Sequence, residues 1–270
     1  MTTHKSLGYY GPDYDSPQAF AVASRYVIFS SPRTGSNYLC ARLSNFRDAL
    51  GIPMEYIHAD ALAEIGARTL GGSAGPAAGP PSQIDIGAYL KALERHRTTA
   101  DGWFGLKLQP GQLFGMTGGN VDQAVSFLRK FDKVVVMLRK DKLAQAISGA
   151  IAHDTGRWFN FGEEAVVARP RATDLFPLIA KLLGRNLTED SLVNAVIARL
   201  ADRPPLVVHY ESLLEDREAV TRQIVWFLKP GLVSLPPEDA KVPVTERPSG
   251  QAAAQLRAEF LAHITNSPPT

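Results

Sequence analysis

Short apolar runs alternate along the chain with longer stretches in which apolar residues recur every three or four positions. The first pattern is typical of buried strands and the second of amphipathic helices. Strands are predicted over residues 26–29, 102–108, 133–139 and 205–210. Helices are predicted over residues 36–50, 84–97, 121–131, 142–152, 191–200, 211–228 and 251–264. This alternation indicates an α/β fold, a three-layer α/β/α sandwich with a mainly parallel central sheet.

Two segments interrupt the alternation. Residues 1–24 mix Gly, Pro, Asp and Tyr without a clear period, so we expect an N-terminal arm before the first strand. Residues 71–83 are rich in Gly and Pro and are expected to form a flexible surface loop. The other elements form one series without an internal repeat, and 270 residues suit one sizeable core. We therefore predict a single domain over residues 1–270.

Composition excludes some classes of protein. The chain is 45% hydrophobic and 21% charged, as in ordinary globular proteins. A net charge of +2 lacks the basic excess of nucleic-acid-binding proteins, so no nucleic-acid partner is expected. The sole cysteine, Cys40, has apolar neighbours in the first predicted helix and is interpreted as a core residue. We find no basic leader and no run of about 18 apolar residues. We therefore expect no transmembrane segment and a cytoplasmic protein.

The stretch over residues 26–39 passes from an apolar strand through Ser-Pro-Arg-Thr-Gly-Ser into a helix. A helix entered through a glycine turn presents unpaired backbone N–H groups and the positive end of its dipole, which favour an anion. Thr34 and Ser36 add hydroxyl donors, and Gly35 permits close approach of the backbone. Arg33 adds a permanent positive charge suited to phosphate or sulfate. We interpret this stretch as a phosphate-binding loop, and an ordinary Ser/Gly turn is the alternative.

Two more basic residues lie in predicted strands. Lys107 interrupts the apolar pattern of residues 102–108, so it requires either a polar partner or an edge strand from which it reaches water. Arg139 ends the strand over residues 133–139. Ligands of open α/β sheets lie beyond the C-terminal ends of the strands. Arg139 is therefore expected at the edge of the sheet where a ligand phosphate could lie. The alternative interpretation of Arg139 is a solvated charge at the end of a strand.

These residues match one family in the same order over most of the chain. The order Pro-Arg-Thr-Gly-Ser after a strand resembles the 5′-phosphosulfate loop of sulfotransferases that use 3′-phosphoadenosine 5′-phosphosulfate (PAPS). The closest resemblance is to the bacterial branch, which includes trehalose 2-sulfotransferase (Stf0-type) and the nodulation-factor sulfotransferases. The segments that carry the resemblance are residues 31–36, 105–108, 133–139 with Ser148, 157–158, 207–214 and 245–248.

The resemblance implies a P-loop NTPase-like fold and a nucleotide held at two ends. The 5′-phosphosulfate is expected to lie on Arg33, Thr34, Gly35, Ser36 and Asn37. Arg139 and Ser148 are expected to hold the 3′-phosphate, and Arg247, in Thr-Glu-Arg-Pro, to bring a late basic segment over the nucleotide. PAPS would be the co-substrate and 3′,5′-adenosine bisphosphate the product. The resemblance implies no metal.

Three residues are expected, from the resemblance, to act on the reacting groups. Glu55 ends a Gly-Ile-Pro-Met-Glu sequence that matches the Gly-x-Pro-x-Glu context of the general base in the bacterial branch. Lys107 matches a lysine near the transferred group and would offset charge on the bridging oxygen. Arg33 would meet the phosphate and the sulfuryl group. Glu55 can reach the loop only if its segment doubles back along the sheet, and an exposed, solubilising glutamate is the alternative.

Contacts to the acceptor are expected from Glu55, His58 and Trp158. His58 is also a reserve base, because it lies three residues after Glu55. Trp158 could stack on adenine or a sugar ring, or serve as a core anchor. The walls of the acceptor site are expected in residues 57–81 and 159–190, whose patterns are the least regular.

We therefore predict a sulfotransferase that moves a sulfuryl group from PAPS to a hydroxyl of a carbohydrate or glycolipid. The alternative is a P-loop-type nucleotide or small-molecule kinase. A kinase requires a lysine after the last loop glycine and usually an acidic strand end for magnesium, and this chain has Asn37 and Arg139 there. A nonenzymatic anion-binding protein on the same fold is a third possibility. The resemblance further predicts a homodimer.

Overall fold

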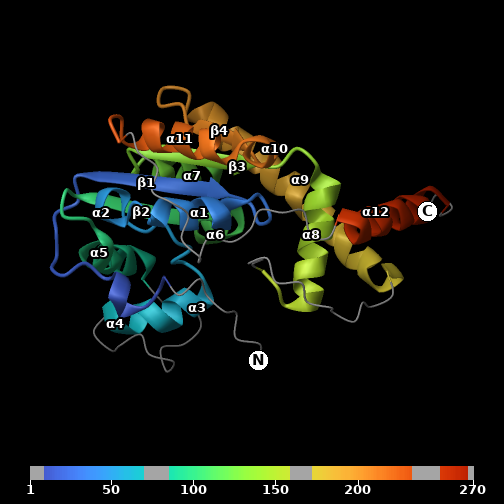
Figure 1. Ribbon diagram of the computed structural model, residues 1–270, viewed down its shortest axis with the longest axis horizontal. Helices are drawn as coiled ribbons and strands as arrows, with labels where there is room; N and C mark the ends of the chain where they lie inside the picture. The colour runs from blue at the N-terminus through green and yellow to red at the C-terminus, as the bar shows by residue number, and fades with distance from the viewer. Residues whose placement is uncertain (1–8, 70–84, 159–171, 233–249, 267–270) are drawn as a thin grey trace.

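The computed structural model of the protein describes residues 9–69, 85–158, 172–232 and 250–266 (Figure 1). In this part of the chain one sheet contains β1 (Ser24–Ser30), β2 (Trp103–Leu108), β3 (Lys133–Leu138) and β4 (Leu206–His209). The strands lie in the order β2-β1-β3-β4, and each neighbouring pair is parallel. The predicted α/β architecture with a parallel central sheet is confirmed.

Helices cover both faces of this sheet. One layer contains α1 (Ser36–Ser44), α2 (Arg47–Leu50), α5 (Ile86–Arg97), α10 (Tyr210–Glu215) and α11 (Arg217–Leu228). The other contains α6 (Pro110–Met116), α7 (Val121–Leu128), α8 (Lys142–Thr155) and α9 (Phe176–Arg199). The short helices are η1 (Pro12–Tyr14), α3 (Ala59–Ala61), η2 (Leu62–Gly66), α4 (Ala67–Thr69) and η4 (Ala172–Leu175). The last helix, α12 (Gly250–Asn266), packs on α8 at the side of the molecule away from α5 (Figure 1).

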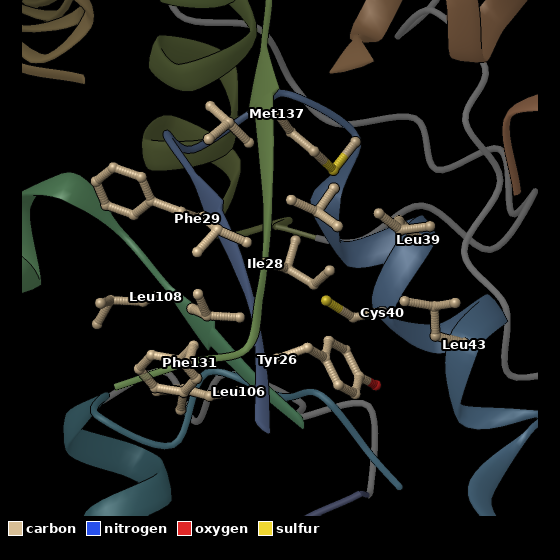
Figure 2. Close-up of a cluster of buried hydrophobic side chains, with 14 of the residues drawn as sticks. Tyr26, Ile28, Phe29, Leu39, Cys40, Leu43, Leu106, Leu108, Phe131 and Met137 are labelled. Atoms are coloured by element: carbon tan, nitrogen blue, oxygen red, sulfur yellow. The ribbon is translucent and has the colours of Figure 1, made fainter. Parts of the chain in front are cut away.

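The core forms around β1, because this central strand is covered on both faces. Ile28 and Phe29 are fully buried and point to opposite sides of the sheet (Figure 2). Ile28 packs toward Leu39 and Cys40 of α1 (Figure 2). Burial raises the pKa of the Cys40 thiol to about 12, so this cysteine is a neutral core residue, as predicted.

Three predicted helices have different limits in the structure. The helix over residues 36–50 is divided into α1 and α2 at Asn45, the C-cap of α1, whose backbone N–H donates to the Arg42 carbonyl at 3.3 Å. The helix over residues 211–228 is divided at Asp216, whose side chain caps α11 by accepting from Ala219 N. The helix predicted from residue 191 begins at Phe176. Pro177 is not a break, because proline is well tolerated in the first turn of a helix.

Two further elements differ from the sequence-based expectation. The strand over residues 205–210 was expected to be buried, but β4 is the outer strand of the sheet and Val207 is 37% exposed. The short helix α6 follows β2 directly and has no apolar period long enough to predict it. Its first turn nevertheless supplies side chains to the candidate site.

The described part of the N-terminal arm packs against the domain core. Tyr9 is buried, and the buried guanidinium of Arg97 donates to the carbonyls of Tyr9, Tyr10 and Gly11 at 2.9–3.1 Å. Tyr10 in turn lies against Tyr56, with ring centroids 5.9 Å apart. The flexible loop predicted over residues 71–83 lies outside the described residues. Within the described residues, no helix has both the length and the apolar character needed to cross a membrane.

Candidate active site

The loop that the sequence predicts to bind phosphate follows β1 and leads into α1. Gly35 has a φ of 78°, and a Cβ there would lie 2.8 Å from Leu213 of α10. Glycine is therefore required both by the backbone conformation and by the close approach of α10. Thr34 is fully buried, and its hydroxyl donates to the Ser31 carbonyl at 2.9 Å, which closes the turn. Ser36 begins α1, so the N-terminal N–H groups of α1 face the space enclosed by the loop.

Arg33 is held in a strained backbone conformation. Its φ is 64°, and no other described residue except glycines has a positive φ. Arg139 Nη1 donates to the Arg33 carbonyl at 3.1 Å, and Gln145 Nε2 donates to the Pro32 carbonyl at 2.8 Å. These two contacts from the end of β3 and from α8 stabilise a conformation that costs about 1–3 kcal/mol for a residue with a side chain.

The side chain of Arg33 lies against α8. Its Nε donates to Ser148 Oγ at 2.9 Å, and its Nη1 donates to the Trp158 carbonyl at 2.7 Å. Burial, and then the positive charge of Arg139, lower the pKa of Arg33 to about 10. Arg33 is half-buried and Arg139 is buried, and their two positive charges form a cationic site that an anion would stabilise. The structure thus brings Arg33 next to Arg139 and Ser148, the two residues expected at the other end of the nucleotide.

Glu55 reaches the loop because its segment runs along the outer edge of β2. Met54 forms a parallel bridge with Leu106, and its carbonyl accepts from Lys107 N at 2.9 Å. The segment therefore doubles back along the sheet, which is the condition under which Glu55 could approach the loop. The Glu55 side chain is only 14% exposed, so it is not a solubilising surface residue.

Lys107 connects Glu55 to the phosphate-binding loop. Its Nζ donates to Asn37 Oδ1 at 2.6 Å and to Glu55 Oε2 at 2.8 Å. The lysine side chain is 6% exposed, so it does not extend into water as the alternative required. Asn37 belongs to the first turn of α1, and a positive charge, a carboxylate and the loop are therefore in direct contact.

Two glutamines complete the surroundings of Glu55. Gln109 Nε2 and Gln112 Nε2 donate to Glu55 Oε1 at 2.6 and 3.0 Å. Burial raises the pKa of Glu55, but the charge of Lys107 and the hydrogen bonds from Lys107 and Gln109 outweigh it and hold this pKa below its ordinary value. Sequence reasoning missed both glutamines. The signal that could have found them is the i, i+3 spacing at the start of a helix directly after the lysine strand.

The remaining predicted site residues are placed less centrally. His58 is exposed and lies close enough to Glu55 to lower its pKa. Trp158 is half-buried, and its ring meets the ring of His153 edge-on at 4.8 Å. Arg247 lies outside the described residues, as do residues 70–81 and 159–171 of the expected acceptor walls. Among the described residues, no group of three or more His, Cys, Asp or Glu could hold a metal ion.

The architecture and this loop define the class of protein, an α/β protein with a parallel sheet and a glycine turn between its first strand and α1. A family model described as Stf0 sulphotransferase matches residues 25–256. The chain belongs to the Stf0 sulfotransferase family.

Two solved structures are similar to this chain. A sulfotransferase from Alicyclobacillus acidocaldarius is 17% identical, with a TM-score of 0.49, over 91% of this chain and 94% of that one. The sulfotransferase domain from the curacin biosynthetic pathway is 12% identical, with a TM-score of 0.49, over 93% of this chain and 100% of that one. No curated protein sequence matches the chain.

Proposed function

We propose that the protein transfers a sulfuryl group from PAPS to a hydroxyl group of an acceptor. The observation that carries the proposal is the contact of Lys107 with both Glu55 and Asn37, which supports a role for Glu55 as the base and for Lys107 as a positive charge beside the loop. Membership of the sulfotransferase family supports the reaction class. One domain would carry the whole activity.

The residues at the loop fit a nucleotide with two separate anions. The N-terminal N–H groups of α1, with the hydroxyl of Ser36 and the amide of Asn37, would bind the 5′-phosphosulfate. Arg139 and Ser148 would bind the 3′-phosphate. The half-buried side chain of Arg33, which has no ion pair with a carboxylate among the described residues, supports an anionic ligand at this place. Arg247 stays a prediction for the same nucleotide.

The chemical step requires a base and stabilisation of the leaving group. Glu55 would accept the proton of the acceptor hydroxyl as the oxygen forms a bond to sulfur. The bond between sulfur and the bridging oxygen breaks, and its electron pair stays on the 5′-phosphate of 3′,5′-adenosine bisphosphate. Lys107 would stabilise the charge that grows on this oxygen. The lowered pKa of Glu55 keeps the carboxylate ionised at neutral pH, which is the form that a base requires.

The acceptor is proposed to be a carbohydrate or glycolipid hydroxyl, in keeping with the resemblance to the bacterial branch. His58 and Trp158 would contact it. The same resemblance supports a homodimer, and the use of a cytosolic nucleotide supports a cytoplasmic location.

Turnover with a radiolabelled sulfuryl donor tests the proposal. The protein would be incubated with [³⁵S]PAPS and a panel of sugars and glycolipids, with and without EDTA. We expect a labelled sulfate ester that forms without added metal and is lost in Glu55→Gln. Phosphoryl transfer from ATP and Mg²⁺ to the same panel, with no sulfuryl transfer, would favour the kinase alternative instead.

A further inference from the structure

Two glutamines, the N-cap residue and the third residue of α6, reach the same oxygen of Glu55. Gln109 and Gln112 both donate to Oε1, whereas Lys107 donates to Oε2. An ionised carboxylate offers about four acceptor positions, two on each oxygen. Among the described residues, these three bonds fill both positions of Oε1 and one position of Oε2. The position that is left for an acceptor hydroxyl therefore lies on Oε2, beside Lys107.

The orientation of Gln112 is fixed by its own contacts. Its Oε1 accepts from the backbone N–H of Gln109 at 2.9 Å, and its Nε2 donates both to Glu55 and to the Ile57 carbonyl, each at 3.0 Å. Pro110, the first residue of α6, has a backbone preset for the helix. The amide that meets Glu55 is thus held by a rigid turn and by the backbone on both sides, as accurate positioning of a reactive group requires.

We infer that Gln109 and Gln112 are positioning residues that hold Oε1 of Glu55, so that Oε2 is the atom that receives the acceptor proton. The inference rests on the proposed function, because it concerns the proposed base. In the step, the proton passes from the acceptor oxygen to Oε2 while that oxygen bonds to sulfur. The sulfur bond to the bridging oxygen breaks, and its electron pair remains on the departing phosphate. Lys107, which contacts Oε2, would also stabilise the negative charge on the bridging oxygen of the departing phosphate.

The same bonds set the basicity of Glu55. Hydrogen bonds to an ionised carboxylate stabilise the charged form and lower its pKa. The titratable groups that face Glu55 are Lys107 from β2, Tyr10 from the N-terminal segment, Cys40 from α1, and His58. Burial raises the pKa of Tyr10 and of Cys40, so both are neutral where Glu55 titrates. Of these groups, only Lys107 and His58 lower the pKa of Glu55, and the hydrogen bond from Gln109 acts with them.

A direct titration of Glu55 tests the inference without nucleotide or acceptor. The protein would be labelled with [δ-¹³C]glutamate, and the Glu55 signal would be assigned by its loss in Glu55→Gln. Gln109→Leu removes one donor and leaves the bonds of Gln112 in place. We expect the pKa of Glu55 to rise by about half a unit to one unit in this variant, and further in Gln109→Leu/Gln112→Leu. Gln123→Leu, at an exposed position of α7, should leave it unchanged.

The rate of sulfuryl transfer provides the second readout. In Gln109→Leu the acid limb of the kcat/KM profile should move to higher pH by the same amount. The plateau value of kcat should fall about tenfold because Oε1 is no longer held, whereas KM for PAPS should change less than twofold. Gln109→Asn, whose amide is one methylene too short to reach Glu55, should act in the same direction if the leucine variant fails to fold.

The outcomes separate this inference from the proposed function. An unchanged Glu55 titration in the glutamine variants, with an inactive Glu55→Gln, would overturn the positioning role alone. A Glu55→Gln protein with full turnover would overturn the base itself, and the role of Oε2 with it. A raised pKa together with a shifted acid limb supports both.

Discussion

The ammonium of Lys107 lies 2.8 Å from Glu55 Oε2, although the two residues are 52 positions apart in sequence. The pair forms because the residue before Glu55, Met54, is bridged to Leu106 of β2 and accepts a hydrogen bond from the backbone N–H of Lys107. Both side chains are nearly buried, so each charge depends on the other for its stability. This pair lowers the pKa of the proposed base and joins the Glu55 segment to β2 through side chains.

Lys107→Met should destabilise the protein at neutral pH. The variant leaves a buried carboxylate without its cation, and removal of one partner of a buried pair costs about 3–5 kcal/mol. The variant should lose less stability at pH 5 than at pH 8, because burial now raises the pKa of Glu55 and protonation removes the unpaired charge. Urea denaturation at the two pH values measures both effects.

In the parent protein, by contrast, Glu55 should lose its stabilising contribution at acid pH. The folded-state pKa of Glu55 is lowered, so its stabilising contribution is complete above the ordinary pKa and is lost as the pH falls through the lower, folded-state value. Lys107→Met/Glu55→Gln is the matched control, because it removes both charges, and it should be more stable than Lys107→Met alone. An equal loss of stability in Lys107→Met, relative to the parent, at both pH values would contradict the electrostatic account.

Glu55→Gln should lower turnover by about 10²- to 10⁴-fold, because the amide keeps the shape of the side chain but cannot accept a proton. Affinity for 3′,5′-adenosine bisphosphate should change little. The parent rate should rise with pH through one ionisation below 4.5, because the pKa of Glu55 is lowered, and this limb should disappear in the variant. Near-normal turnover with the same acid limb would remove Glu55 from the mechanism and direct attention to His58.

Arg139→Ala should reduce discrimination by the 3′-phosphate. A charge-assisted hydrogen bond contributes about 1.5–3 kcal/mol, so the preference for 3′,5′-adenosine bisphosphate over 5′-AMP should fall by about 10- to 100-fold. Some loss of affinity for both ligands is also expected, since Arg139 supports the Arg33 carbonyl. Lys140→Ala, at the exposed neighbouring position, is the control. Calorimetric titration of both nucleotides that shows an unchanged preference would exclude Arg139 as the reader of the 3′-phosphate.

Gly35→Ala should lower the stability of the protein by more than the strained backbone alone would cause. The new Cβ would lie 2.8 Å from Leu213 and 3.1 Å from Tyr210, in addition to the cost of the positive φ. Gly118→Ala is a matched control, because Gly118 has a φ of 58° and open space around it. We expect about 1–2 kcal/mol of destabilisation in the control and more in Gly35→Ala, with loss of nucleotide binding only in the latter. Equal effects in the two variants would mean that α10 does not constrain the loop.

The sequence predicted the sheet and the loop because their signals are local. A continuous apolar run such as residues 133–138 indicates a buried parallel strand, and a glycine turn after residues 26–29 indicates an anion-binding loop. The polar requirement of Lys107 was also visible, because a lysine in an apolar strand needs a partner. The start of the helix predicted from residue 191 was wrong, because α9 begins at Phe176 and Pro177 lies in its first turn, where proline does not interrupt a helix.

The arrangement of the site depends on contacts that no local pattern encodes. Glu55 lies at the loop only because Met54 pairs with β2, a contact between distant segments. In the sequence, Gln109 and Gln112 are ordinary polar residues at the start of a helix. Their role depends on this pairing, because it brings the carboxylate of Glu55 within hydrogen-bonding distance of both side chains. The direction of the Arg33 side chain follows from a positive φ that other parts of the fold impose.

The most direct test of the account is a competition for the nucleotide site, because it does not require the acceptor to be known. Calorimetric titrations would compare 3′,5′-adenosine bisphosphate without metal, 5′-AMP, and ATP with Mg²⁺ on the same protein. We predict that the bisphosphate binds at least tenfold more tightly than 5′-AMP, without magnesium, and displaces any bound ATP. Binding of ATP that requires Mg²⁺, with no preference for the 3′-phosphate, would contradict the assignment of this site to a sulfuryl donor.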